Sequence, residues 1–188
     1  CNCKFAVQYY ANDTEWTCNI SVTDRGGTGK PGEELNFSDS GTDTATVSKL
    51  LAVDTPTAVL DYGNLSVTQT SAAIMRNVTN VGNTDFNLTF RGYGSDNESI
   101  GQNVTMICDL GNITFGNHRY IVGTNVTFGT MRNLTNQTRD SNFTLSQKTN
   151  DNNIGLEFNE TFWRLQIPLS VGGICNGTII FGAIETGE

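Results

Sequence analysis

The chain has 188 residues, of which 37% are hydrophobic, so it can bury the core of one large domain. Its commonest residue types are Thr, Asn and Gly, which favour strands and turns over helices. The net charge of −8, with only four lysines and no basic stripe, argues against nucleic acid and anionic membrane surfaces as partners.

The first 22 residues contain two segments in which apolar residues alternate. Lys4–Tyr10 is predicted to be a short extended segment, and Trp16–Val22 a strand, because every second side chain of a strand faces the same side. The residues expected on the buried faces are Phe5, Val7 and Tyr9 in the first segment and Trp16, Cys18, Ile20 and Val22 in the second. The polar, Gly-rich stretch that follows, Asp24–Asp43, is expected to be a long loop.

Further strands are predicted from residue 46 onward, at the regular spacing that is typical of a β-sandwich. They lie near residues 46–54, 57–62, 64–69, 72–78, 85–91, 103–108, 112–115, 119–128, 142–146, 155–158, 161–167 and 174–183. No helical periodicity persists over ten residues. We therefore predict an all-β chain with one β-sandwich domain over residues 14–188, preceded by an N-terminal extension over residues 1–13.

The number of N-glycosylation sequons, Asn-x-Ser/Thr, indicates the compartment in which the protein is expected. Of the 22 asparagines, 15 lie in Asn-x-Ser/Thr, where chance would give about four. They are Asn12, Asn19, Asn36, Asn64, Asn77, Asn87, Asn97, Asn103, Asn112, Asn125, Asn133, Asn136, Asn142, Asn159 and Asn176. Because this motif is modified only on secreted chains, we expect a heavily N-glycosylated extracellular or cell-surface protein. The start at Cys1 is read as a mature, processed N-terminus.

Several sequons follow the pattern Asn-apolar-Ser/Thr-apolar, as at Asn87–Phe90 and Asn125–Phe128. In a strand, this pattern turns the Asn and the Ser/Thr to solvent and the apolar residues to the core. Sugars would then stand on the outer faces of the sheets and block face-to-face association, which leaves the sheet edges and the ends of the domain free for protein contacts.

Disulfides are expected among the five cysteines of a secreted chain. Cys108 and Cys175 both lie in the C-terminal half on inward positions and form the first predicted pair. Cys3 and Cys18 are a second candidate pair, although a tight hairpin would leave them four residues out of register, about 13 Å. Cys1 is left over as a free thiol, an intermolecular link or a lipidation site, and we leave these readings open.

Signatures of catalysis are missing from the sequence, and we predict that the chain is not an enzyme and takes no cofactor other than N-linked glycans. The single histidine, His118, has no second ligand-like residue nearby, and no GxSxG, Walker or GxGxxG motif occurs. The Asp/Asn-rich loops at Ser38–Asp43 and Thr149–Asn153 match no calcium-loop spacing and are read as solvated turns.

Four short runs of the sequence form a recognisable set, namely Leu60–Leu65 (LDYGNL), Asn77–Asp85 (NVTNVGNTD), Trp163–Pro168 (WRLQIP) and Cys175–Phe181 (CNGTIIF). Together they resemble immunoglobulin-like domains of archaeal secreted surface proteins. The chain is also similar to subunits of archaeal threads and pili. This resemblance implies an immunoglobulin-like β-sandwich and a filament of identical subunits, joined head to tail by donor-strand complementation.

The resemblance makes the N-terminal extension a candidate donor strand, with Phe5, Val7 and Tyr9 filling a groove in a neighbouring subunit. The alternative, equally open, is that this extension forms the first strand of the chain's own sheet. If the extension is not the donor, Ile174–Ile184 is the next candidate. The alternative function is a non-polymeric glycosylated cell-surface or viral adhesin or S-layer-type domain, with cell-surface or host contacts.

Overall fold

A computed structural model describes residues 6–20, 41–55, 59–150, 155 and 157–186. Its strands are β1 (Glu15–Ile20), β2 (Gly41–Thr46), β3 (Val53–Asp54), β4 (Ile74–Asn80), β5 (Phe86–Gly94), β6 (Met106–Leu110), β7 (Asn112–Ile113), β8 (His118–Val122), β9 (Arg132–Asn133), β10 (Arg139–Leu145), β11 (Phe158–Leu165) and β12 (Gly172–Glu185). The short helices are α1 (Glu98–Gly101), η1 (Phe115–Asn117) and η2 (Phe128–Thr130). The predicted all-β class is confirmed.

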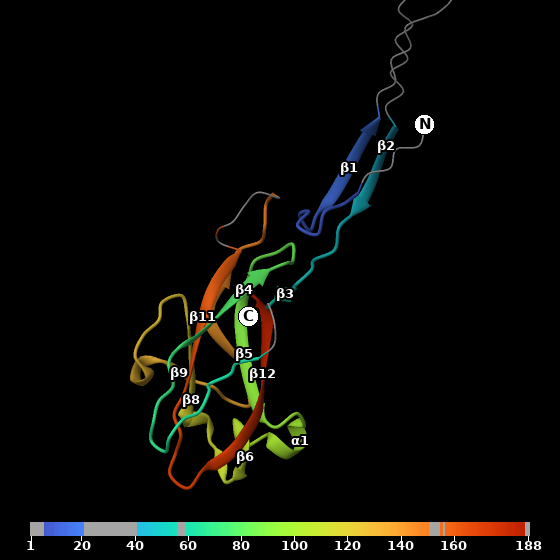
Figure 1. Cartoon of the computed structure of the whole chain (residues 1–188). Coiled ribbons are helices and arrows are strands. Elements are labelled where there is room, and N and C mark those ends of the chain that lie inside the picture. The colour runs from blue at the N-terminus through green and yellow to red at the C-terminus, as the bar shows by residue number, and fades with distance from the viewer. Residues whose placement is uncertain (1–5, 21–40, 56–58, 151–154, 156, 187–188) are drawn as a thin grey trace, which may run out of the picture.

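Two five-stranded antiparallel sheets form the body of the molecule (Figure 1). The strand order of the first, here the β12 sheet, is β10-β5-β12-β6-β7, and that of the second, the β11 sheet, is β3-β4-β11-β8-β9. The arrangement is sandwich-like. A third, two-stranded sheet made of β1 and β2, here called the arm, projects from one end of the body (Figure 1).

Aromatic side chains fill the core between the two sheets. Trp163 of β11, Tyr120 of β8 and Phe90 of β5 are all buried, and Phe90 lies with its ring centroid 4.5 Å from that of Tyr120 and 5.3 Å from that of Trp163. Phe181 of β12 joins them at 5.1 Å from Phe90. Burial of such rings, each worth about 1.5–3 kcal/mol, holds the β11 sheet and the β12 sheet together.

Asn83 ties the arm to the body. Its side chain is 2% exposed, accepts a hydrogen bond from the backbone N–H of Leu50 and donates to the backbone carbonyls of Ala11 and Ser48. These bonds reach the chain both before β1 and after β2, so one buried amide fixes both ends of the arm. Trp16, predicted to face inward, is 43% exposed because a two-stranded ribbon has no sheet packed against it.

Several local predictions are corrected. Residues 6–10 form no strand, and Phe5 lies outside the described residues. The strand expected at 64–69 is irregular, with a turn at residues 67–68, and the described residues 59–62 of the candidate strand 57–62 are irregular too. The two candidates 155–158 and 161–167 contribute to one strand, β11. β2 and β9 were not predicted; β2 begins within the expected polar loop, where its Thr-rich sequence pairs with β1.

Candidate functional site: an open strand edge, its groove and the sequons

One edge of β12 is open. β12 pairs with β5 along Gly177–Glu185, but on its other side it pairs with β6 only at Gly172, Cys175 and Asn176. Within the described part of the chain, the stretch Thr178–Glu185 therefore has no strand partner on the side away from β5. Figure 1 shows this part of β12 in red along one flank of the body. Unpaired N–H and C=O groups of an edge are a template for an added strand.

The β11 sheet is also incomplete next to this edge. β3 pairs only with Thr79 and Asn80 of β4, so Ile74–Val78 has no described strand partner on that side. Residues 59–62 pass here without joining either sheet, and the Arg76 guanidinium donates to the Val59 backbone carbonyl. The two sheets thus leave one side of the sandwich covered by an irregular segment.

A groove of about 760 Å³ lies on this side and meets the open edge of β12 at Thr178, Ile179 and Phe181. Its apolar wall includes Leu60, Tyr62, Ile179 and Phe181, the last two from the inward face of β12. Ile174, 82% exposed, also lines it, near the start of β12. An apolar groove that borders unpaired strand edges can receive an extended peptide, with main-chain hydrogen bonds to the edge and alternate side chains in the groove.

A buried hydrogen-bond chain lies under the groove. The Tyr62 hydroxyl is 2.6 Å from Nε2 of His118, and the Thr105 hydroxyl is 2.6 Å from Nδ1. Burial lowers the pKa of His118 to about 3, so the ring is neutral at physiological pH, and burial raises the pKa of Tyr62. The neutral ring donates through one nitrogen and accepts through the other, which fastens Tyr62 to β8.

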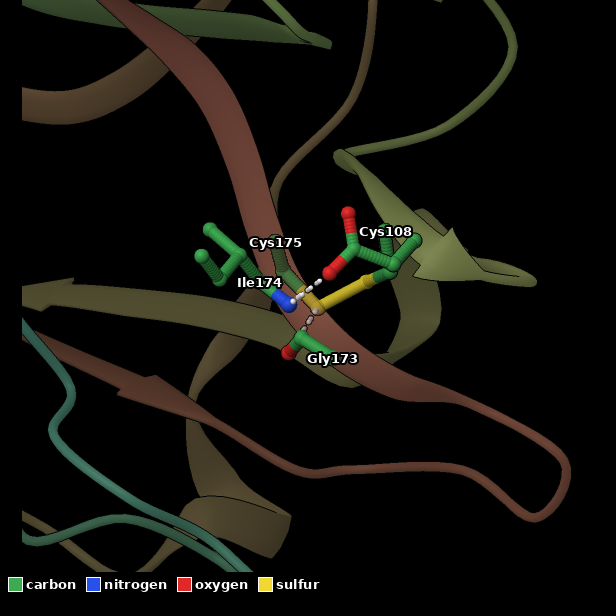
Figure 2. Close-up of a disulfide and its surroundings, with 5 residues drawn as sticks. Cys108, Gly173, Ile174 and Cys175 are labelled. Carbon is green, nitrogen blue, oxygen red and sulfur yellow. Dashed lines mark hydrogen bonds between the residues drawn. A yellow bond between two sulfur atoms is a disulfide. The ribbon is translucent and has the colours of Figure 1, made fainter.

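The predicted disulfide between Cys108 and Cys175 is present (Figure 2). The two residues are directly opposite each other in the β6–β12 register, with Cα atoms 3.9 Å apart. The backbone N–H of Ile174 donates to the Asp109 carboxylate at 2.8 Å, and the Ile174 side chain points away from β6 (Figure 2). The bond therefore fixes β6 to β12 just before the point where the edge of β12 opens.

The remaining cysteines form no further described pair. Cys18, on β1, is a free thiol, so the second candidate pair is not formed in the structure. Cys1 and Cys3 lie outside the described residues.

None of the sequon asparagines whose side chains the structure describes is fully buried. Nine are exposed, namely Asn12, Asn64, Asn97, Asn103, Asn112, Asn125, Asn133, Asn142 and Asn176. Four are partly buried, namely Asn77, Asn87, Asn136 and Asn159. The fully buried asparagines, Asn80 and Asn83, carry no sequon and use their amides in hydrogen bonds to the backbone. The side chain of Asn19 and all of Asn36 lie outside the description.

The predicted alternation of exposed and buried residues in the sequons holds only in part. It is found at Asn142–Leu145, where Asn142 and Thr144 are exposed and Leu145 is buried, and likewise at residues 112–115 and 125–128. It is wrong at Thr89 and Thr105, which are 2% and 1% exposed. β5 is flanked by strands on both sides, and Thr105 turns inward to bind His118.

The described part of the N-terminal candidate donor, residues 6–10, does not line the chain's own groove. Val7 and Tyr9 are exposed, and neither lines the groove. The alternative candidate, Ile174–Ile184, is part of β12 and pairs with β5 in its own sheet.

No protein-family model, curated protein or solved structure matches this chain. Over the described residues, no group of three or more His, Cys, Asp or Glu side chains is placed to hold a metal ion. None of the described helices is long and apolar enough to cross a membrane.

Proposed function

We propose that the chain is a structural subunit of an archaeal extracellular filament, a thread or pilus, in which identical subunits join head to tail by donor-strand complementation. The observation that carries this proposal is the open edge of β12, which borders an apolar groove and is matched by the incomplete edge of β4. The immunoglobulin-like character of the sandwich and the archaeal source belong to the same proposal and rest on the sequence resemblance.

The donor is the N-terminal extension of the next subunit. An extended segment beside Thr178–Glu185 would bond to the backbone of β12, and every second side chain would enter the groove next to Ile179 and Phe181. Phe5, Val7 and Tyr9 have this spacing. Burial of each of the three is worth on the order of 1.5–3 kcal/mol. Such a contact is heterologous and does not close on itself, so it adds subunits without limit.

The accessible sequons and the disulfide support the extracellular and N-glycosylated parts of the proposal. A sugar can be attached only where the asparagine amide reaches solvent, and the buried asparagines are the ones without a sequon. Disulfides persist mainly in oxidising compartments outside the cytosol.

The test is assembly with and without the extension. Deletion of residues 1–10 should leave a folded monomer by circular dichroism that forms no filaments in electron micrographs. A free peptide of residues 1–10 should block growth of the intact protein, whereas a matched peptide with Phe5, Val7 and Tyr9 changed to Ser should not. Normal filaments from the deletion variant would show that the N-terminal donor is wrong.

A second candidate function is a non-polymeric glycosylated surface domain, of the adhesin or S-layer type. The arm favours it, because it projects from the body and exposes Trp16. Size in solution separates the two functions. A ladder of oligomers that resists mild denaturant supports the filament, and a single monomeric species supports the surface domain.

A further inference from the structure

A second hollow lies on the outer face of the β11 sheet, away from the groove. It has a volume of about 480 Å³ and is lined by Thr70, Asn125, Val126, Thr127, Phe128 and Arg164. Arg164 points outward on β11, because its neighbours Trp163 and Leu165 are buried in the core. The size is in the range of small-ligand sites, about 300–1,000 Å³.

A sequon asparagine forms part of the wall. Asn125 is exposed, and its side-chain oxygen accepts a hydrogen bond from Nη2 of Arg164 at 3.3 Å. The amide nitrogen, the atom to which an N-linked sugar is attached, makes no hydrogen bond within the described chain. Arg164 therefore orients the Asn125 amide at the rim of the hollow and leaves its nitrogen, the attachment point for a sugar, without a hydrogen bond to the described residues.

The walls combine an apolar ring with a guanidinium. The Arg119 guanidinium lies 4.5 Å from the centroid of the Phe128 ring and also donates to the Phe128 backbone carbonyl, which fixes this residue at the hollow. The Arg164 guanidinium reaches the rim through Nη2, which donates to Asn125, whereas its Nε–H is buried below the surface and has no hydrogen-bond partner among the described residues. A sugar ring presents C–H groups on its faces and oxygen atoms at its edge, so it can contact an aromatic ring and accept from a guanidinium together.

We propose that the glycan on Asn125 folds back and that its innermost sugar lies in this hollow, with a ring face on Phe128 and an oxygen toward Arg164. The sugar is then a structural part of the β11 sheet's outer face. The inference rests on the N-glycosylation in the proposed function and is independent of filament assembly.

The test uses glycoprotein from a host that N-glycosylates. Thr127→Ala removes the sequon and leaves Asn125 and Arg164 in place, whereas Thr127→Ser keeps the sequon. Ser99→Ala removes the sequon of Asn97, an exposed residue at the N-cap of α1 that does not line the hollow, and serves as the comparison. Thr127→Ala should lower the unfolding midpoint by about 2–4 °C relative to Thr127→Ser, corresponding to about 1 kcal/mol for a domain of this size. Ser99→Ala should leave it unchanged.

Two controls assign the effect to the sugar. In protein made without glycosylation, Thr127→Ala and Thr127→Ser should unfold at the same temperature. In an Arg164→Met background, the loss caused by Thr127→Ala should shrink, because the oxygen contact is already gone while the apolar stem remains.

Each failure has its own meaning. Mass spectrometry that finds Asn125 unmodified while other sequons are occupied overturns this inference alone, and bare sequons throughout overturn the proposed glycosylation. An occupied Asn125 whose loss costs no more than loss of the Asn97 glycan shows that the sugar does not lie in the hollow.

Discussion

Acid should destabilise the fold through His118. Burial lowers the pKa of this ring to about 3, whereas in the unfolded chain it has its ordinary value of about 6.5. Between these values the unfolded chain binds one more proton than the folded chain, so the free energy of unfolding falls as the pH falls. The slope approaches about 1.4 kcal/mol per pH unit between the two pKa values, which gives a loss of about 2 kcal/mol between pH 6.5 and pH 5 and about 4 kcal/mol by pH 3.

The measurement is urea unfolding at pH 7.5 and pH 5.0, followed by the fluorescence of the buried Trp163. The control is His118→Gln, which keeps a donor and an acceptor but does not titrate. This variant should be less stable than the parent at pH 7.5, yet its stability should fall by about 2 kcal/mol less on acidification. Carboxylates contribute equally to both proteins and cancel in the comparison. Equal pH slopes would mean that His118 titrates normally in the folded protein, and the argument from burial would be wrong.

Three further predictions concern stability and modification. Reduction of the Cys108–Cys175 bond should lower the free energy of unfolding by about 2–5 kcal/mol, and non-reducing peptide mapping should recover the pair; two alkylated cysteines in unreduced protein would contradict it. Gly101→Ala should lower the free energy of unfolding by at least about 2 kcal/mol in thermal unfolding, because the added Cβ would lie 1.7 Å from a backbone oxygen of β5. Gly129→Ala, whose Cβ would meet open space, should leave the stability unchanged. Intact native protein should have a mass far above 20.4 kDa, with lower occupancy at the partly buried Asn77 than at exposed sequons; a mass at the polypeptide value would refute this.

Local sequence patterns correctly predicted the features that depend on residues close together in the chain, such as strand positions and inward-facing side chains. The alternation in 174–183 lies within β12, and the inward positions of Cys108 and Cys175 fit their disulfide. The strands predicted from residue 72 onward each overlap a strand of the body. The disulfide could be predicted because both cysteines occupy inward strand positions in the C-terminal half of the chain, and disulfides are expected in a secreted chain.

Pairings between distant segments could not be predicted in this way. Nothing local in Gly41–Thr46 shows that it pairs with β1, and the buried state of Thr89 depends on β10 and β12 on either side of β5. His118 was read as an isolated residue, since its partners Tyr62 and Thr105 are 56 and 13 residues away. The open edge of β12 likewise depends on where β6 stops.

The disulfide at the start of that edge has a mechanical consequence. In a filament of the proposed kind, tension would run along the donor strand, parallel to β12, so the hydrogen bonds between the two strands would be loaded in shear and would have to break together. The force would enter β12 along Thr178–Glu185. At Cys175 the disulfide to Cys108 would transmit it to β6. A pulling force would then have to break the main-chain hydrogen bonds on both sides of β12 before the Gly172 end of this strand could separate from the sheet.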